Sequence, residues 1–290
     1  MREFKVTEAQ IADFHSDGFV QVDRIISDES VALLRERFDR LFAEEYETGI
    51  APDEVNWQVE RDPPENTRQL CNAWKADRGV ARVILHSDIG RACATLGGWP
   101  GARISQDNLL WKPPGGKPLG FHQDSAYEQW TAIPDWASCW IALDDTTAEG
   151  GTVEYVRGSH RWGQSGKIDQ FHAPTNPIKE LSAAAAAAGI ESPERVPIVV
   201  KAGGGAFHQG WTWHGSDINH TQRPRRSIVA HCMSSENKFH SEFVSSIYSR
   251  YKKFGTVEMD ESFFPIIWRL DGYRSEFLEK YSANNPTRGT

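Results

Sequence analysis

From about residue 103 the chain breaks into short strand-like runs separated by Gly, Pro and Asp, and this rhythm restricts the fold more than any other feature. The runs cover 103–112, 119–124, 136–144, 152–156, 196–201, 205–208 and 226–233. Many short strands with turn residues between them are typical of a β-sandwich or jelly roll. We therefore predict a mainly β fold with flanking α-helices.

The first 100 residues have a different, more helical pattern. Thr7 and Gln10 have the spacing of a capping box, which predicts a helix through about Phe14. Residues 19–22 alternate like a strand. A second helix is predicted after Ser27, because apolar residues recur there at helical spacing: Val31, Leu33, Leu34, Phe38, Leu41 and Phe42. Residues 50–65 read as a loop, and 67–96 read as helical in patches.

The chain of 290 residues is interpreted as one domain, since β-barrels of this length are often not divided. We expect a mostly helical support over 1–100, a jelly-roll core over 101–235 and a helical, aromatic-rich C-terminal segment over 236–290. An insert over 163–195 interrupts the core. Its run of alanines predicts a short helix, although a plain linker would fit equally well.

Composition narrows the partners and the compartment. The net charge is -8 and is spread along the chain, which argues against nucleic acid because phosphate binding favours a basic surface. No apolar run reaches transmembrane length, and the N-terminus has no signal-peptide core. The four cysteines are scattered, as in a reducing compartment. We expect a cytoplasmic protein with a small-molecule substrate and no membrane partner; the sequence does not indicate its oligomeric state.

His122 and Asp124 form an H-x-D pattern in a strand-like run. Residues i and i+2 of a strand point to the same face, so both side chains can bind one metal. Two histidines with one carboxylate hold one face of Fe(II) and leave the other open. The pattern alone is weak, because the chain also contains His15-Ser-Asp17, which we interpret as structural.

The second histidine ligand must come from far along the chain. Its candidates are His160, His172, His208, His214, His220, His231 and His240. His214 is favoured, because His-Gly-Ser follows a strand-like run and precedes Arg225. His208 is the main rival, since it lies at an expected strand end only six residues earlier. Either could instead be an ordinary core histidine.

Arg225 indicates a site for a dicarboxylate. A co-substrate that chelates iron through one end needs its far carboxylate held, and a guanidinium does this with two parallel hydrogen bonds. Ser216 could add a hydroxyl from the same segment. The alternative is an exposed basic turn of Arg223, Arg225 and Arg226, in which at least two are expected to be exposed.

Residues near the triad are candidate substrate contacts. Tyr127, Glu128 and Trp130 follow Asp124 directly, and Trp213 precedes His214. Gln106 and Asn108 are expected on a neighbouring strand, pointing inward. Aromatic faces mixed with amides suit a polar, ring-containing molecule such as a sugar, although a barrel rim needs aromatic packing in any case. No basic cluster fits the phosphates of coenzyme A.

Several ordered motifs resemble the phytanoyl-CoA dioxygenase family of Fe(II)/2-oxoglutarate oxygenases. They run from about residue 14 to 233: Phe14-His-Ser-Asp-Gly-Phe-Val, Lys112-Pro-Pro-Gly, Phe121-His-Gln-Asp, Trp140-Ile-Ala-Leu-Asp-Asp-Thr-Thr-Ala-Glu-Gly-Gly-Thr, Val156-Arg-Gly-Ser-His, and His214-Gly-Ser with Asn219 and Arg225. The resemblance implies a double-stranded β-helix core with helices packed outside. It implies iron bound by His122, Asp124 and His214. It also implies 2-oxoglutarate held by four residues: Arg225, Ser216, Trp140 and Lys112.

The resemblance also implies the reaction. Fe(II), 2-oxoglutarate and O2 would oxidise a small molecule by hydroxylation or oxidative cyclisation, releasing succinate and CO2. Related halogenases carry a small residue in place of the carboxylate, so Asp124 argues against halogenation. Two alternatives use the same fold: a cupin-like metal enzyme that does not need 2-oxoglutarate, and a non-catalytic binding barrel.

Overall fold

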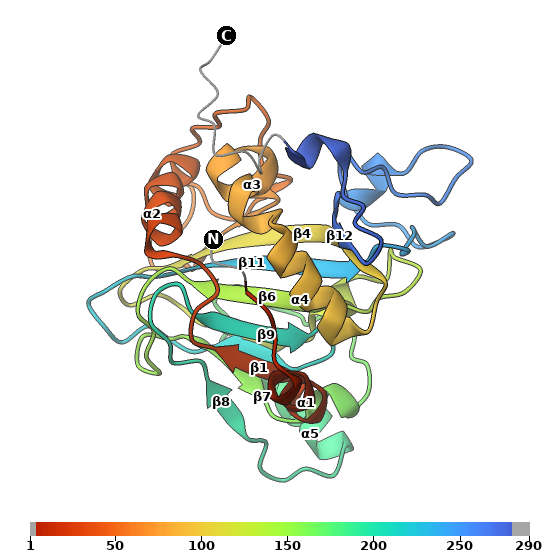
Figure 1. The fold of residues 1–290 in the computed structure, drawn as a ribbon. Helices are drawn as coiled ribbons and strands as arrows, with labels where there is room; N and C mark the ends of the chain where they lie inside the picture. The colour runs from red at the N-terminus through yellow and green to blue at the C-terminus, as the bar shows by residue number, and fades with distance from the viewer. Residues whose placement is uncertain (1–3, 280–290) are drawn as a thin grey trace.

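A computed structural model describes residues 4–279 of the chain (Figure 1). Two β-sheets face each other, and helices cover the outer face of the larger one. The strands are β1 Phe19–Val22, β2 Glu54–Val55, β3 Arg68–Cys71, β4 Gly101–Lys112, β5 Leu119–His122, β6 Ala137–Ala142, β7 Val153–Val156, β8 Arg195–Pro197, β9 Gly205–Gln209, β10 His214–Ser216, β11 Arg225–Ser234 and β12 Ile266–Arg269. The predicted mainly β fold with flanking helices is confirmed.

Five α-helices accompany the sheets in the described chain: α1 Glu8–Asp17, α2 Asp28–Phe42, α3 Arg78–Ile84, α4 Ser87–Gly97 and α5 Lys179–Ala187. The capping box predicted for the first helix is confirmed, since Thr7 accepts from Gln10 N and the Gln10 side chain accepts from Thr7 N. Within residues 4–279, no helix is both long and apolar enough to cross a lipid bilayer.

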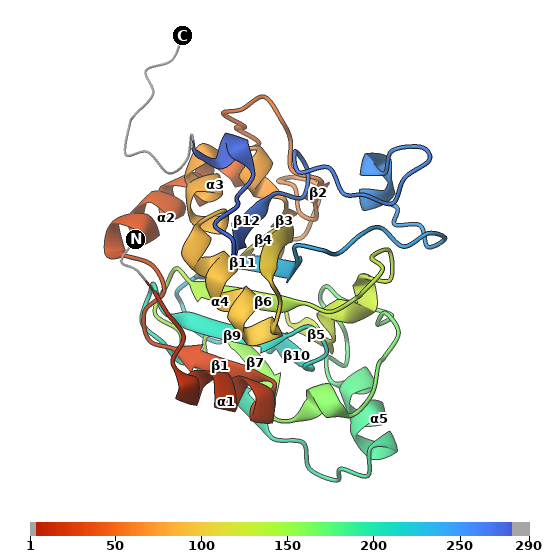
Figure 2. The same ribbon diagram turned by 45° about the vertical axis from the view of Figure 1, so that its right-hand side comes forward.

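The larger sheet has the strand order β1-β9-β6-β11-β4-β3-β2, with β12 also paired to β4, and the smaller has β5-β10-β7-β8. Helices α2, α3 and α4 lie over one face of the larger sheet (Figures 1 and 2). Residues alternate along each strand. On β6, Cys139 and Ile141 pack with the helices, whereas Trp140 and Ala142 pack between the sheets with Tyr155. The space between the sheets is therefore where inward-facing polar residues meet.

Two expectations for the N-terminal part need correction. Residues 67–96 do not begin as a helix, because Arg68–Cys71 forms strand β3 and pairs with β4. The expected loop over 50–65 contains the short strand β2, which pairs with β3. The 1–100 segment is thus part of the larger sheet as well as its helical cover, because the edge of β4 needs a hydrogen-bonding partner.

The prediction of a helical C-terminal segment is wrong for the part of it that the structure describes. Residues 236–278 contain strand β12 and two 3-10 turns, η4 Tyr248–Tyr251 and η5 Glu276–Leu278, but no α-helix. The aromatic residues Phe239, Tyr248 and Phe264 of this segment are spaced irregularly and do not form a helical stripe. They pack in one cluster with Met259 and with three residues from earlier in the chain, Trp130, Trp136 and Met233. Residues 280–290 of the expected helix lie outside the described residues.

The insert over 163–195 carries the expected short helix, α5. Leu181 and Ala185 are its buried residues. Leu181 packs with Phe121 and Trp213, so the helix covers the outside of the smaller sheet next to β5. The insert is therefore attached to the strand that carries His122.

Candidate metal and co-substrate site

Pairing of β5 with β10 brings two histidines together. His122 and His214 are direct cross-strand partners, and their ring centroids lie 4.3 Å apart. Gly215 permits this close pairing, because a Cβ there would come 2.6 Å from the Phe121 ring. The glycine of the motif His214-Gly-Ser is therefore needed for steric reasons, because strands β5 and β10 pack closely at this point.

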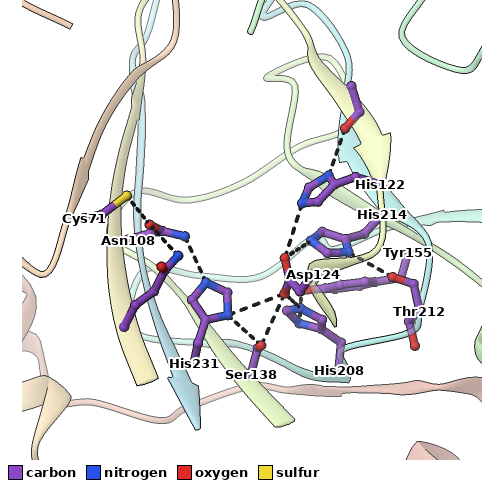
Figure 3. Close-up of polar contacts among 12 residues, drawn as sticks. Cys71, Asn108, His122, Asp124, Ser138, Tyr155, His208, Thr212, His214 and His231 are labelled. Atoms are coloured by element: carbon purple, nitrogen blue, oxygen red, sulfur yellow. Dashed lines mark hydrogen bonds and ion pairs between the residues drawn. The ribbon is translucent and has the colours of Figure 1, made fainter. Parts of the chain in front are cut away.

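Asp124 completes the group (Figure 3). The strand ends at His122, and Asp124 begins the 3-10 turn η2 Asp124–Tyr127, so the expectation that both lie on one strand is wrong in detail. The side chains still converge. Asp124 Oδ1 lies 3.2 Å from His122 Nε2 and 3.4 Å from His214 Nε2. In the described chain these three residues offer ligand atoms within 4.8 Å of one another.

Backbone carbonyls orient both imidazoles. His122 Nδ1 lies 2.9 Å from Gly120 O, and His214 Nδ1 lies 2.9 Å from Thr212 O. A carbonyl oxygen only accepts, so each Nδ1 carries a proton and Nε2 is the ring nitrogen directed toward Asp124. Burial lowers the pKa of His122; at His214 the charge and hydrogen bond of Asp124 outweigh burial and raise the pKa. A metal would bind each ring at an unprotonated Nε2. This is the tautomer that a metal ligand needs.

The second oxygen of Asp124 has separate partners, all from the larger sheet. Asp124 Oδ2 lies 2.9 Å from His208 Nε2, 3.3 Å from Ser138 Oγ and 3.4 Å from His231 Nδ1. Burial alone would raise the pKa of Asp124, but His214, His231, His122 and His208 outweigh it and hold the pKa well below its usual range. Asp124 is therefore a carboxylate with Oδ1 directed at the two ligand histidines.

The rival ligand His208 has a different place. It lies on β9 and contacts Asp124 Oδ2, while its Nδ1 lies 2.8 Å from the Tyr155 hydroxyl. Burial lowers the pKa of His208 to about 3. A neutral imidazole that donates to Oδ2 and receives a hydrogen bond from Tyr155 supports the carboxylate from behind.

His231 links the site to a chain of polar side chains. Its Nε2 lies 2.9 Å from Asn108 Nδ2, Gln106 Nε2 donates to Asn108 Oδ1 at 3.3 Å, and the Tyr248 hydroxyl donates to Gln106 Oε1. Because Asn108 Nδ2 is a donor, the neutral His231 ring accepts at Nε2. This series of polar contacts therefore connects Asp124 with Tyr248 in the C-terminal segment.

An inner cavity with an empty volume of ≈ 490 Å³ extends from the triad between the sheets. Arg225, Ser216 and Trp140 line it, as do Tyr155 and Gln69. Arg225 and Ser227 share one face of β11, as expected, and Arg226 points the other way to pair with Asp144. Three of the four residues predicted to hold 2-oxoglutarate, Arg225, Ser216 and Trp140, thus line one chamber with His122, Asp124 and His214.

Arg225 is a buried cation without a salt-bridge partner among the described residues. It donates from Nη1 to Ser227 Oγ at 3.0 Å and from Nη2 to Gly151 O at 2.9 Å, and its Nε makes no hydrogen bond. Burial lowers its pKa to about 10, although the charge of Asp144 opposes the shift. An unpaired buried charge is costly, so this guanidinium fits an anionic ligand.

Lys112 pairs with Arg225 across β4 and β11 but does not itself line the cavity. Its ammonium donates to Ser216 Oγ at 2.8 Å and to Asp217 O. Burial and the nearby Arg225 lower the pKa of Lys112 well below its usual range. Lys112 therefore acts on the chamber through the Ser216 hydroxyl, rather than by the direct contact that we expected.

An outer cavity with an empty volume of ≈ 900 Å³ meets the inner one at His122 and Asp124. Four predicted substrate contacts line it: Gln106, Asn108, Tyr127 and Glu128. Burial raises the pKa of Tyr127 to about 12, and its hydroxyl makes no hydrogen bond with the described residues.

Two predicted substrate contacts, Trp130 and Trp213, lie away from both cavities. Neither lines either cavity. Trp130 packs against Tyr248 in the aromatic cluster, with the rings tilted and their centroids 4.8 Å apart, and Trp213 packs with Phe121 and Leu181. Both rings are buried in apolar clusters instead of lining a cavity.

Sequence reasoning also missed several wall residues: Glu54, Gln69, Cys71, Trp136, Tyr155, Phe171, His172 and Tyr248. Most come from segments without a strong local pattern. Only Tyr155 carried a usable signal, since it lies two residues from Val153 on the inward face of a predicted strand.

Comparison with known proteins identifies the family of this chain. Residues 14–227 match the model of the phytanoyl-CoA dioxygenase (PhyH) family. The mouse phytanoyl-CoA dioxygenase domain-containing protein 1 is 27% identical over 193 residues, which are 66% of this chain and 64% of that one, just under two thirds. The methylphosphonate hydroxylase of Gimesia maris is 26% identical, covering 77% of this chain and 79% of its own.

Among solved structures, the epimerase SnoN in complex with Fe3+, alpha ketoglutarate and nogalamycin RO is similar in fold. The TM-score is 0.68 at 22% identity, covering 90% of this chain and 98% of that one. The fold is the cupin-like, double-stranded β-helix that the sequence led us to expect. This chain belongs to the phytanoyl-CoA dioxygenase family, whose model matches residues 14–227.

Proposed function

We propose that the protein hydroxylates or oxidatively cyclises a small polar molecule, a sugar-containing or other natural-product intermediate, and releases succinate and CO2. The observation that carries the proposal is Arg225. Its buried, unpaired guanidinium lies in a chamber that also contains the three candidate metal ligands. A cupin-like enzyme that does not use 2-oxoglutarate would have no need for this cation.

In the proposal, His122 Nε2, Asp124 Oδ1 and His214 Nε2 bind Fe(II). The donor set fits, because two neutral imidazoles and one carboxylate leave open positions on the metal. Bound iron with O2 supplies the oxidising power that couples decarboxylation of 2-oxoglutarate to attack on a substrate C–H bond. The protein's own part is to hold the carboxylate: His208, Ser138 and His231 contact Asp124 Oδ2 and leave Oδ1 for the metal.

Arg225 binds the far carboxylate of 2-oxoglutarate in this proposal. Its free Nε–H and the adjacent Ser216 hydroxyl supply donors, and Lys112 fixes that hydroxyl. Trp140 and Val229, which are cross-strand partners on the larger sheet, provide an apolar wall. Exclusion of water from this chamber strengthens the pairing of the two charges.

The outer cavity binds the substrate. It opens beside His122 and Asp124, and its walls mix aromatic rings with the amides of Gln106 and Asn108. Such walls suit a polar, ring-containing molecule. The similarity in fold to SnoN, whose complex contains nogalamycin RO, supports a natural-product substrate.

The test is succinate release from 2-oxoglutarate by the purified protein under air. We expect release that requires added Fe(II) and stops with a chelator. Arg225→Lys should raise the KM for 2-oxoglutarate by about tenfold or more, because an ammonium lacks the planar guanidinium donors. Lys201→Arg, on the exposed surface, serves as the matched control. Full turnover by Arg225→Ala would remove Arg225 from this role, and no succinate with Fe(II) present would favour the cupin-like alternative.

A further inference from the structure

Building on the proposed function, we infer that Glu128 anchors a positively charged group of the substrate. The substrate would then be a protonated amine or a similar organic cation, rather than a phosphonate or another anion. This identifies the chemical class that the outer cavity accepts and names the residue that selects it.

Glu128 is a buried acid of this cavity, in addition to Asp124. It follows η2 directly, four residues after Asp124, and its side chain lines the outer cavity while the residue is only 2% exposed. Its Oε2 makes no hydrogen bond with the described residues. A buried carboxyl oxygen without a partner is costly, so a hydrogen-bond donor on a bound ligand would stabilise it.

Burial raises the pKa of Glu128 well above its usual range, the charge of Asp124 adds to this, and the nearby Trp130 indole offsets only part. An arriving cation would reverse the effect by stabilising the charged carboxylate. Burial therefore favours the neutral acid in the empty cavity, and a bound cation would favour the carboxylate.

The other charges of the cavity favour a cation as well. Apart from Asp124, which the proposed function assigns to Fe(II), its charged wall residues are the acids Glu54 and Glu128, against one cation, Lys167. Lys167 is exposed, so it lies in contact with solvent, whereas Glu128 is buried. A phosphonate in this cavity would meet a buried acid and no buried cation on its walls.

Aromatic residues complete the environment. Tyr127, Trp136, Phe171 and Tyr248 line the same cavity. Ring faces attract ammonium and other organic cations, and more strongly where water is excluded. Acid and rings together are suited to a group such as R–NH3⁺. This separates the protein from its Gimesia maris relative, which is named for methylphosphonate.

The experiment compares three probes of matched shape by titration calorimetry: 2-phenylethylammonium, 2-phenylethanol and 2-phenylethylphosphonate. The protein is the full chain with Fe(II) and 2-oxoglutarate under anaerobic conditions, so that binding is measured without turnover. We expect the ammonium to bind about tenfold tighter than the alcohol, or more, and the phosphonate weakest. In Glu128→Gln the ammonium should lose this preference, whereas Glu36→Gln, an exposed residue on α2, should keep it.

Equal binding of ammonium and alcohol by the natural protein would overturn the inference, as would tightest binding of the phosphonate. An unchanged preference in Glu128→Gln would overturn the assignment to this residue. If that variant does not fold, the probe order in the natural protein and a Glu128→Asp variant decide. Succinate release without probe, measured on the same preparations, separates the two proposals: its presence with no ammonium preference rejects this inference alone.

Discussion

Asp124 uses its two oxygens for different tasks, and this division organises the site at the scale of single residues. Oδ1 lies near His122 and His214, while Oδ2 contacts His208, Ser138 and His231. Residues that contact the ligand atoms and residues that contact the carboxylate from behind should therefore respond differently to substitution.

We predict that His214→Ala abolishes iron binding and that His208→Ala only weakens it. Removing a direct ligand breaks the metal site, whereas removing a supporting partner of a ligand costs about 10–100-fold in affinity. Anaerobic Fe(II) titration and iron content after desalting would measure both. Loss of iron in His208→Ala with retention in His214→Ala would contradict the proposed ligand set.

The buried His172 leads us to expect that the free energy of unfolding depends on pH. Burial lowers its pKa to about 4 from 6.5, and its Nδ1 makes no hydrogen bond within the described chain. Because the folded pKa lies below the unfolded one, the unfolded chain binds more protons between these values, and the free energy of unfolding falls as pH drops through this window.

In His172→Gln this contribution disappears, so the free energy of unfolding should fall less steeply between pH 6.5 and about 4. A residual slope is expected, since burial also lowers the pKa of His208 and His231. Urea unfolding of both proteins across this range is the measurement. Parallel curves for the two proteins would show that His172 does not titrate as expected.

At the scale of elements, the C-terminal segment is joined to the substrate cavity through Tyr248. Its ring packs against Trp130 and its hydroxyl donates to Gln106 on β4. Nearby, Asp53 receives hydrogen bonds from Lys75 at 2.6 Å and from the Tyr251 hydroxyl at 2.5 Å. The 3-10 turn η4 is thus attached both to β4 and to the region beside β2.

We expect Tyr248→Phe to lower the free energy of unfolding by about 1 kcal/mol, because it removes one hydrogen bond and keeps the ring. Tyr248→Ala should cost ~3–5 kcal/mol, because it also leaves a cavity among the aromatic residues. Urea unfolding at pH 7 compares the two. If both variants lose the same amount, ring packing is not what attaches this segment.

At the scale of the whole molecule, the candidate metal site connects the two sheets. His122 and His214 belong to the smaller sheet, while His208, Ser138 and His231 belong to β9, β6 and β11 of the larger one. Asp124 contacts members of both sets. A ligand that binds here should therefore stabilise the entire fold rather than one loop.

Fe(II) at about 100 times its dissociation constant should raise the free energy of unfolding by ~2.7 kcal/mol, because it binds only the folded state. Anaerobic thermal or urea unfolding with and without Fe(II) measures this increment, and a chelator should remove it. Asp124→Ala should show none of the increase. An equal increase in that variant would place the metal elsewhere.

Local features of the sequence predicted the capped first helix and most strands of the core. A capping box and alternation along a strand depend on neighbouring residues, so Thr7 with Gln10 and the inward face shared by Arg225 and Ser227 could be predicted. The motif His214-Gly-Ser was likewise recognisable, because the spacing of its residues is local.

Only the tertiary structure decided what each side chain meets. Trp130 and Glu128 were equally good substrate contacts by position, yet one packs in an aromatic cluster and the other is a buried acid in the cavity wall. His208 and His214 were both possible ligands until strand pairing placed His214 opposite His122. The aromatic C-terminal segment had no period from which its fold could be predicted. These outcomes depend on contacts between residues far apart in the chain, which no local pattern contains.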